Sequence, residues 1–248
     1  MGYAQLLLPE TEGDEMTTVQ RCNTPMGVDA DVYTPQADSY LLLSAMDKAR
    51  ITSGSRVLDL CTGSGVVAMN AATCGAREVI AVDIEPAAVR CAKAAAADAG
   101  LAIEVVHGGL VDALALAPFD VVLCNPPYVP SSDHEVQKDS LSSAWNAGRD
   151  GRRVLEPLCA NMASLLTPGG IALIVHSEFA GITTSLRQLR NAGLTATVVK
   201  RKTIPFGPVM RSRARWLEMR GILDRGRRME EIVVIRAQRG ADGGDQAS

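Results

Sequence analysis

The most informative part of this sequence is residues 57–65, Val57-Leu58-Asp59-Leu60-Cys61-Thr62-Gly63-Ser64-Gly65. Its apolar run passes directly into a turn with two glycines, and a helical pattern follows. Glycine lets the backbone approach a ligand closely. About 20 residues beyond Gly63, a second apolar run ends in Asp83, where a carboxylate can accept hydrogen bonds from ribose hydroxyls. Together the two features indicate a cofactor that carries a nucleoside.

Apolar runs alternate with helical patterns along the rest of the chain. This alternation is typical of an α/β protein whose parallel strands are covered by helices on both faces. We expect strands at 56–60, 78–83, 103–107, 120–124, 171–176, 195–200 and 231–237. We expect helices at 36–50, 66–74, 86–99, 151–166 and 179–191.

Composition limits the class of protein. The chain has 248 residues, of which 47% are hydrophobic, which suffices for one sizeable core. Its six cysteines form no Cys-x-x-Cys pair or zinc-ligand spacing, so we expect no metal and a reducing compartment. No apolar stretch approaches the roughly 18 residues that span a bilayer, and the amino terminus lacks the basic start of a signal peptide. We therefore expect a cytoplasmic protein that does not enter a membrane.

A second motif follows the apolar run at 119–124, which ends in Asn125-Pro126-Pro127-Tyr128. Ligand sites in open α/β sheets lie outside the carboxyl ends of strands. Two prolines fix the backbone and remove two N–H donors, which leaves carbonyl oxygens free to accept hydrogen bonds. Asn125 adds a side-chain oxygen, and Tyr128 adds a flat aromatic face. This set suits a planar –NH2 group, as in glutamine, adenine, cytosine or guanine.

Each motif also has a simpler interpretation. The run Gly63-Ser64-Gly65-Val66-Val67-Ala68 fits the dinucleotide fingerprint G-x-G-x-x-A of NAD enzymes. Asn-Pro-Pro-Tyr could be a proline-rich turn with a surface tyrosine. The NAD interpretation leaves the Asn-Pro-Pro-Tyr motif unexplained, and the strand before that motif argues against a mere turn.

Residues 32–237 resemble the HemK-type class I methyltransferases that modify glutamine in translation release factors, especially their short archaeal and eukaryotic branch. Beyond the two motifs, the resemblance rests on Val32-Tyr33-Thr34-Pro35-Gln36-Ala37-Asp38-Ser39-Tyr40-Leu41-Leu42 and on Ala144-Trp145-Asn146-Ala147-Gly148-Arg149-Asp150-Gly151. It implies the class I methyltransferase (Rossmann-like) α/β fold, a seven-stranded sheet with helices on both faces. We expect a leader at 1–31, a methyltransferase domain at 32–239 and a flexible tail at 240–248.

The resemblance implies S-adenosylmethionine as the cofactor. Its binding residues would be Tyr33, Pro35, Asp38, Asp59, Cys61, Thr62, Gly63, Gly65, Asp83, Ile84, Gly109, Leu110 and Asn125. The catalytic residues would be Asn125, Pro126 and Tyr128, and Pro127 and Trp145 would also contact the substrate. The nitrogen of an amide is a poor nucleophile, so positioning must supply much of the rate. We expect the Asn125 oxygen and the Pro126 carbonyl to accept the two amide N–H groups while Tyr128 packs on the substrate plane.

Two positions depart from the family pattern. After the third strand the family usually has Gly-Asp-Leu, whose acid holds the adenine amine, whereas this chain reads Gly108-Gly109-Leu110. Asp112, a backbone carbonyl or water could take that place. Ala37 stands where the branch often has Glu. The family pattern therefore gives the least information about the residues that bind the adenine of the cofactor.

Competing functions share these motifs. An adenine-specific DNA methyltransferase would flip its base into the same pocket, but such enzymes usually carry a recognition domain that this chain has no spare residues to form. A ribosomal RNA guanine methyltransferase, a small-molecule N-methyltransferase and a binding module without catalysis stay open. The leading interpretation is an N-methyltransferase acting on the side-chain amide of a glutamine in a translation release factor or a similar protein.

Two features point to macromolecular partners. Residues 187–239 hold 14 Lys or Arg against 4 Asp or Glu, which is either a solvated surface or a contact region, with Arg211, Arg213 and Arg215 expected on a loop. The strand predicted at 103–107 would lie at an open edge of the sheet, without lysine or proline to block pairing. Relatives in the short branch bind a small zinc-binding activator subunit along this edge, so the resemblance implies such a subunit, or self-association through the same strand.

Overall fold

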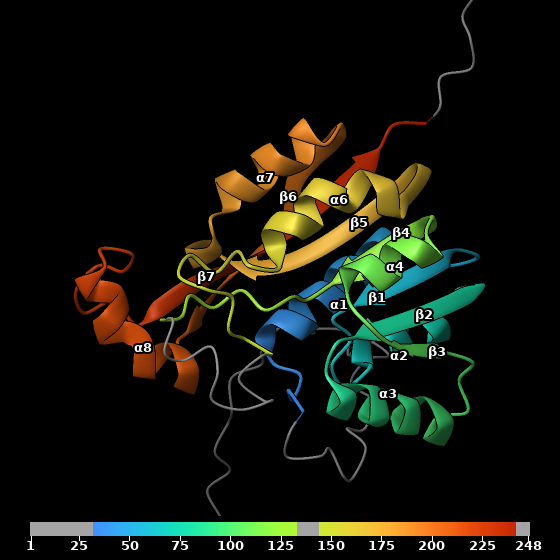
Figure 1. Ribbon diagram of the computed structural model, residues 1–248, viewed down its shortest axis with the longest axis horizontal. Coiled ribbons are helices and arrows are strands. Elements are labelled where there is room, and N and C mark those ends of the chain that lie inside the picture. The colour runs from blue at the N-terminus through green and yellow to red at the C-terminus, as the bar shows by residue number, and fades with distance from the viewer. Residues whose placement is uncertain (1–31, 133–143, 242–248) are drawn as a thin grey trace, which may run out of the picture.

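Within residues 32–132 and 144–241, which the computed structural model describes, seven strands form one sheet (Figure 1). They are β1 (Arg56–Leu60), β2 (Glu78–Asp83), β3 (Glu104–His107), β4 (Phe119–Cys124), β5 (Leu166–Ser177), β6 (Leu194–Pro205) and β7 (Met229–Arg239). All seven predicted strands are present, and the last three are longer than predicted. The leader predicted at 1–31 and all but the first two residues of the tail predicted at 240–248 lie outside the described residues.

The strand order is β3-β2-β1-β4-β5-β7-β6. The first five strands are parallel, and β7 pairs antiparallel with both β5 and β6. The order reverses between the neighbours β1 and β4, and ligands of open α/β sheets bind at such a switch point. Because Leu60 pairs with Cys124, the glycine turn after β1 and Asn125 after β4 emerge at the same edge.

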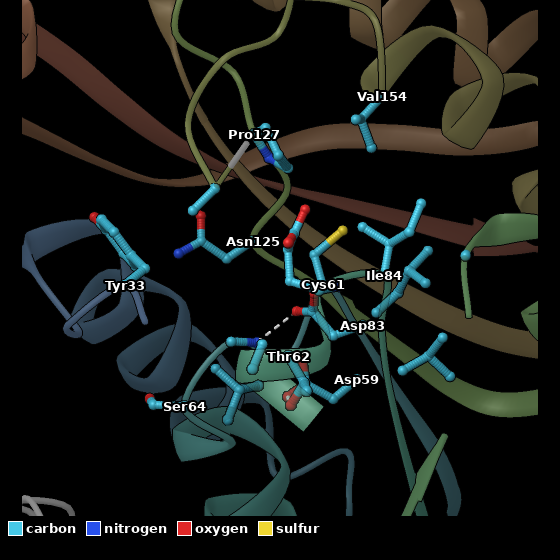
Figure 2. Close-up of a pocket in the computed structure, with 18 of the residues that line it drawn as sticks. Tyr33, Asp59, Cys61, Thr62, Ser64, Asp83, Ile84, Asn125, Pro127 and Val154 are labelled. Carbon is cyan, nitrogen blue, oxygen red and sulfur yellow. Dashed lines mark hydrogen bonds between the residues drawn. The ribbon is translucent and has the colours of Figure 1, made fainter. Parts of the chain in front are cut away.

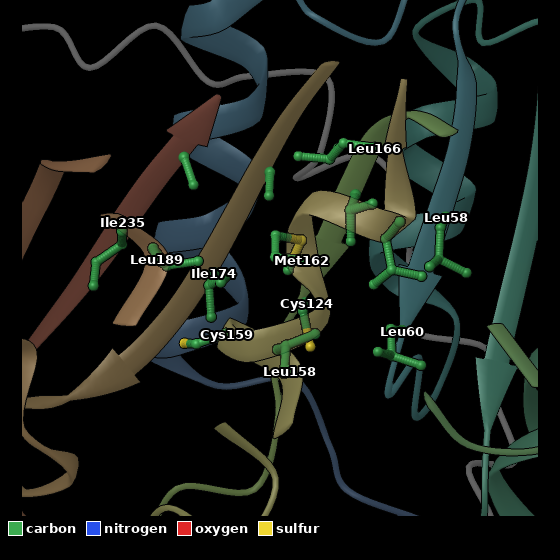
Figure 3. Packing of buried hydrophobic residues seen from close by; sticks show 14 of the residues in the cluster. Leu58, Leu60, Cys124, Leu158, Cys159, Met162, Leu166, Ile174, Leu189 and Ile235 are labelled. Carbon is green, nitrogen blue, oxygen red and sulfur yellow. The ribbon is translucent and has the colours of Figure 1, made fainter. Parts of the chain in front are cut away.

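Helices cover both faces of the sheet (Figure 1). One face packs against α1 (Ala37–Ala49), α2 (Val66–Thr73) and α3 (Pro86–Asp98), and the other against α4 (Leu110–Leu116), α6 (Leu155–Leu165) and α7 (Ile182–Asn191). Figure 3 shows Leu158 and Met162 of α6 lying over Cys124 and Ile174 of the sheet. The helix predicted at 151–166 begins only at Leu155, the one predicted at 179–191 is divided by Gly181, and α4 was not predicted. None of the described helices is long and apolar enough to cross a membrane.

The loop predicted around the C-terminal arginines is wrong, because this segment contains α8 (Pro208–Met219). Pro208 stands in the first turn, where its missing N–H costs nothing. Met210, Ala214 and Leu217 are buried on one side of α8 and pack with Val129 into a separate apolar cluster. The helix therefore supports the segment that follows Asn-Pro-Pro-Tyr.

Candidate functional site

A cavity of about 450 Å³ opens beyond the carboxyl ends of β1, β2 and β4 (Figure 2). Its volume lies within the range of small-molecule sites, roughly 300–1,000 Å³. The predicted cofactor residues that line it are Tyr33, Pro35, Asp59, Cys61, Thr62, Gly63, Asp83, Ile84, Gly109, Leu110 and Asn125. The structure thus brings together predicted residues from five separate segments of the chain.

Gly63 and Gly65, the two glycines of the turn after β1, have different structural roles. Gly63 has φ +55°, and a Cβ there would meet no atom within 4 Å, so the space beside its backbone belongs to the cavity. Gly65 has φ +82°, but a Cβ there would lie 3.1 Å from Cβ of Ala92 in α3. It is not among the lining residues. Gly65 therefore permits close helix packing, while Gly63 keeps the ligand side open.

Asp83 ends β2 with its carboxylate held in place. Oδ2 accepts a hydrogen bond from the Gly63 N–H at 2.8 Å, and Oδ1 accepts one from the Glu85 N–H at 3.0 Å. Burial raises the pKa of Asp83, against the opposing effect of these hydrogen bonds. A carboxylate can accept about four hydrogen bonds, so acceptor capacity is left for a pair of ribose hydroxyls.

Asp59 lies in the floor of the cavity and stabilises the turn. Its Oδ2 accepts hydrogen bonds from Thr62 Oγ1 at 2.5 Å and from the Ala68 N–H at 3.0 Å. The residue is 1% exposed, and this burial raises the pKa of its carboxyl to about 7. The carboxyl group ties the turn to the start of α2.

The predicted adenine end has no acidic side chain in the family's position. Gly109 lines the cavity, and Asp112 does not, because its Oδ2 accepts a hydrogen bond from the Gly109 N–H at 2.8 Å. A Cβ on Gly109 would meet only Cδ1 of Ile84, at 4.0 Å. Asp112 instead caps α4, so it would have to shift locally before it could hold the adenine amine.

The acceptor end is built around Asn125. Its side chain lies in the cavity, and its Nδ2 donates to Ser39 Oγ at 3.3 Å. Pro127 also lines the cavity, whereas Pro126 is buried outside the lining. Tyr128 is not a lining residue either, because its hydroxyl donates to Asp38 Oδ2 at 2.9 Å and its ring packs against the core. We expected the Tyr128 ring to pack on the substrate plane, but in this structure the ring does not reach the cavity.

The residues of segment 32–42 that line the cavity differ in part from those predicted. Tyr33 and Pro35 line the cavity, but Asp38 is 4% exposed and lies behind it, where it also accepts a hydrogen bond from the Tyr33 hydroxyl at 3.1 Å. Ser39 takes the place in the lining that was assigned to Asp38. Trp145 packs against the α8 cluster instead of lining the cavity.

Sequence reasoning missed several lining residues near the acceptor end. They are Ser39, Arg153, Val154, Pro157 and Leu158. Most lie just before or within α6, where the only sequence signal was an apolar helical pattern. That pattern predicts a buried face but does not show which residues reach the cavity.

Comparison with known proteins identifies the family. Residues 33–203 match the family described as methyltransferase small domain. The chain belongs to this family. It is 31% identical over 180 residues to a putative protein N5-glutamine methyltransferase of Methanocaldococcus jannaschii, covering 73% of this chain and 89% of the relative. It is 37% identical over 177 residues to the release factor glutamine methyltransferase of Deinococcus radiodurans, covering 68% of this chain and 63% of that enzyme.

Solved structures give the same fold. The Mtq2-Trm112 complex of E. cuniculi, responsible for the methylation of the eRF1 translation termination factor, matches with a TM-score of 0.58 and 21% identity, covering 85% of this chain and 99% of that chain. The protein is therefore a HemK-type, S-adenosylmethionine-dependent class I methyltransferase. The cavity of the methyltransferase fits this cofactor, because it offers a ribose-binding carboxylate at Asp83, open space beside Gly63 and an apolar wall at Ile84 and Leu110.

Proposed function

We propose that this methyltransferase modifies the side-chain amide nitrogen of a glutamine in a translation release factor, through a domain that occupies residues 32–239. The observation that carries the proposal is the position of Asn125, whose carboxamide stands in the cofactor cavity at the carboxyl end of β4. A carboxamide there can bind a planar –NH2 group beside a methyl donor. The names of the archaeal and bacterial relatives support glutamine as the acceptor.

The chemistry requires the amide nitrogen to be turned and held. When bound, S-adenosylmethionine supplies an electrophilic methyl group on its sulfonium sulfur. Asn125 Oδ1, which lies in the cavity, accepts one N–H of the substrate amide and so helps to direct the nitrogen lone pair toward that methyl group. The same oxygen faces the positive charge that develops on nitrogen as the new bond forms.

The proton that the methylated nitrogen loses goes to water in this proposal. Of the described histidines, His107 has its Nε2 at 2.9 Å from the Ile84 carbonyl oxygen, and His176 is buried in β5. Neither lines the cavity. Burial lowers the pKa of His176 to about 4, so at neutral pH this ring is uncharged and separated from the substrate.

The test supplies the purified methyltransferase with methyl-labelled S-adenosylmethionine and separate candidate acceptors: a bacterial release factor, eRF1, total RNA, DNA, and a protein-free small-molecule extract. We expect label in one release factor, and peptide mass spectrometry should place it on a glutamine. The Asn125→Ala variant serves as the control for the site. Label in nucleic acid or in the small-molecule fraction, with both release factors unlabelled, would overturn the proposal.

We also propose that a partner pairs with the edge strand β3. The two edges of the sheet differ, because β6 carries Lys200, Arg201 and Lys202 and has an irregularity after Val198, features that block pairing. Residues 103–107 contain no lysine or proline, and Val111, which follows β3 closely in the chain, is 79% exposed. The related Mtq2 was solved as a complex with Trm112. A small zinc-binding activator subunit or a second copy of this chain would suit this edge.

Val105 of β3 is 8% exposed, so a lysine there would disturb the fold as well as the edge. Val111→Asp is the cleaner variant, because an exposed acid in the first turn of α4 suits the helix. Light scattering of the purified protein, alone and mixed with a Trm112-type subunit, measures association. We expect Val111→Asp to weaken whichever complex forms. A wild-type protein that stays monomeric and binds no such subunit would refute the partner proposal.

A further inference from the structure

A chain of hydrogen bonds runs from the first turn of α1 to Asn125. Asp38 Oδ1 accepts the backbone N–H of Ser39 at 2.7 Å and the Ser39 hydroxyl at 3.4 Å. Ser39 Oγ in turn accepts a hydrogen bond from Asn125 Nδ2 at 3.3 Å. Asp38 and Ser39 are each 4% exposed, so water does not replace these contacts readily.

The chemistry of the three groups gives the chain a direction. A carboxylate only accepts hydrogen bonds, and a hydroxyl has a single proton to donate. When that proton points at Asp38, the side of Ser39 Oγ that faces Asn125 carries lone pairs. The –NH2 end of the Asn125 carboxamide can bond there, whereas its oxygen would be repelled. Figure 2 shows the amide nitrogen of Asn125 on the side of Tyr33 and the amide oxygen turned toward Pro127.

We infer that Ser39 is a positioning residue that fixes the Asn125 carboxamide with Oδ1 toward the methyl acceptor; this inference rests on the proposed role of Asn125 in binding the acceptor nitrogen. The two ends of a carboxamide have nearly the same shape, so packing alone discriminates poorly between its two orientations. In the reversed orientation Asn125 would present an –NH2 group to the substrate –NH2, donor against donor. Such a flipped site binds cofactor but does not hold the acceptor.

Asp38 is a less informative residue to change, because it also holds Tyr33 and Tyr128 through their hydroxyls. Replacing it would disturb several parts of the site together. The Ser39 hydroxyl, by contrast, makes its described side-chain bonds to Asp38 and Asn125 alone. Ser39→Ala therefore removes the orienting group while keeping a small side chain in the first turn of α1.

The experiment compares Ser39→Ala, Ser39→Thr and Ser44→Ala, using the release factor that takes up label in the assay above. Ser44 is the matched control, since it lies on the same helix and its hydroxyl also has a partner, Lys200 Nζ, away from Asn125. We expect Ser39→Ala to lower kcat about tenfold, the effect of losing one typical hydrogen bond. Its Kd for S-adenosylhomocysteine should stay within about twofold of wild type. Ser39→Thr should restore kcat, and Ser44→Ala should not change it.

A double-mutant cycle with Asn125→Ala separates positioning from a general structural effect. If Ser39 acts through Asn125, then Ser39→Ala should have no further effect on kcat in the Asn125→Ala background. Additive losses, or a kcat of Ser39→Ala equal to that of wild type while Asn125→Ala is inactive, would overturn the inference and leave the proposed function standing. Full turnover by Asn125→Ala would instead overturn the role of Asn125 in the proposed function.

A second measurement does not depend on the substrate. The side-chain –NH2 signals of Asn125, assigned by their loss in Asn125→Ala, report on the Ser39 contact in the NMR spectrum. We expect these protons to exchange slowly with water in the wild type and in Ser39→Thr, and faster in Ser39→Ala. Unchanged exchange in Ser39→Ala would refute the orienting contact even if no acceptor had been found.

Discussion

Replacing Gly109 by Asp should tighten cofactor binding. Gly109 has φ −124° and ψ −157°, which an aspartate adopts without strain, and a Cβ there would meet only Ile84 Cδ1 at 4.0 Å. The position is the N-cap of α4, where aspartate is among the preferred residues. By the family pattern, the new carboxylate would stand where the adenine amine of the cofactor binds.

The size of the gain follows from two opposing terms. A hydrogen bond to a charged group contributes about 1.5–3 kcal/mol. Ordering the new side chain costs on the order of 0.5–1.5 kcal/mol. The net gain of about 1.4 kcal/mol corresponds to roughly tenfold tighter binding of S-adenosylhomocysteine.

Titration calorimetry measures this change, with Gly109→Ala as the control for the loss of glycine flexibility. S-inosylhomocysteine, which has an oxygen in place of the adenine amine, provides the decisive comparison. The carboxylate should repel that oxygen, so Gly109→Asp should bind the inosyl compound more weakly than Gly109→Ala does. Equal gains for the two ligands, or no gain over Gly109→Ala, would refute the placement of the adenine amine at this residue.

Three further predictions follow from the site and its support. Asn125→Ala should lower turnover at least about 100-fold while changing cofactor affinity little, and Asp83→Ala should mainly weaken cofactor binding; kinetics and calorimetry on the same preparations check this. Because the pKa of Asp59 is raised to about 7 in the folded state, its contribution to stability is fully present below about pH 4 and is lost as the pH rises toward 7. The free energy of unfolding of the wild type should therefore fall relative to that of Asp59→Asn by up to about 4 kcal/mol as the pH rises through this range. A difference between the two proteins that does not change with pH would contradict the raised pKa. Arg213 is 5% exposed and bonds the Pro130 carbonyl and Asn146 Oδ1, so Arg213→Ala should cost about 3 kcal/mol in urea unfolding, whereas Arg211→Ala, at an exposed position of α8, should stay within about 0.5 kcal/mol of wild type.

The strands and the two motifs could be predicted because each depends on local sequence. An apolar run that ends in Gly63 or Asn125 gives the same signal in any context. Local sequence could not show that Ser39, and not Asp38, would line the cavity. Successive residues of a helix point about 100° apart, so which one reaches the cavity depends on how α1 docks.

The helix α8 was missed for a different reason. Glycine and proline around Phe206 favour a turn, and the arginines that follow suggest an exposed loop. The buried positions Met210, Ala214 and Leu217 nevertheless have the i, i+4, i+7 spacing of a helix, and Pro208 is an acceptable first residue. The charges on Arg211, Arg213 and Arg215 masked this pattern, although the Arg213 side chain points inward.

The position of β7 has a consequence for synthesis of the protein. This strand lies between β5 and β6, yet the ribosome makes it after both of them. Until Met229–Arg239 has left the ribosome, β5 and β6 each present a long, unpaired edge to other chains. A nascent chain that stalls before Met229 is therefore prone to aggregate, and a product truncated there should appear in the insoluble fraction of a cell lysate.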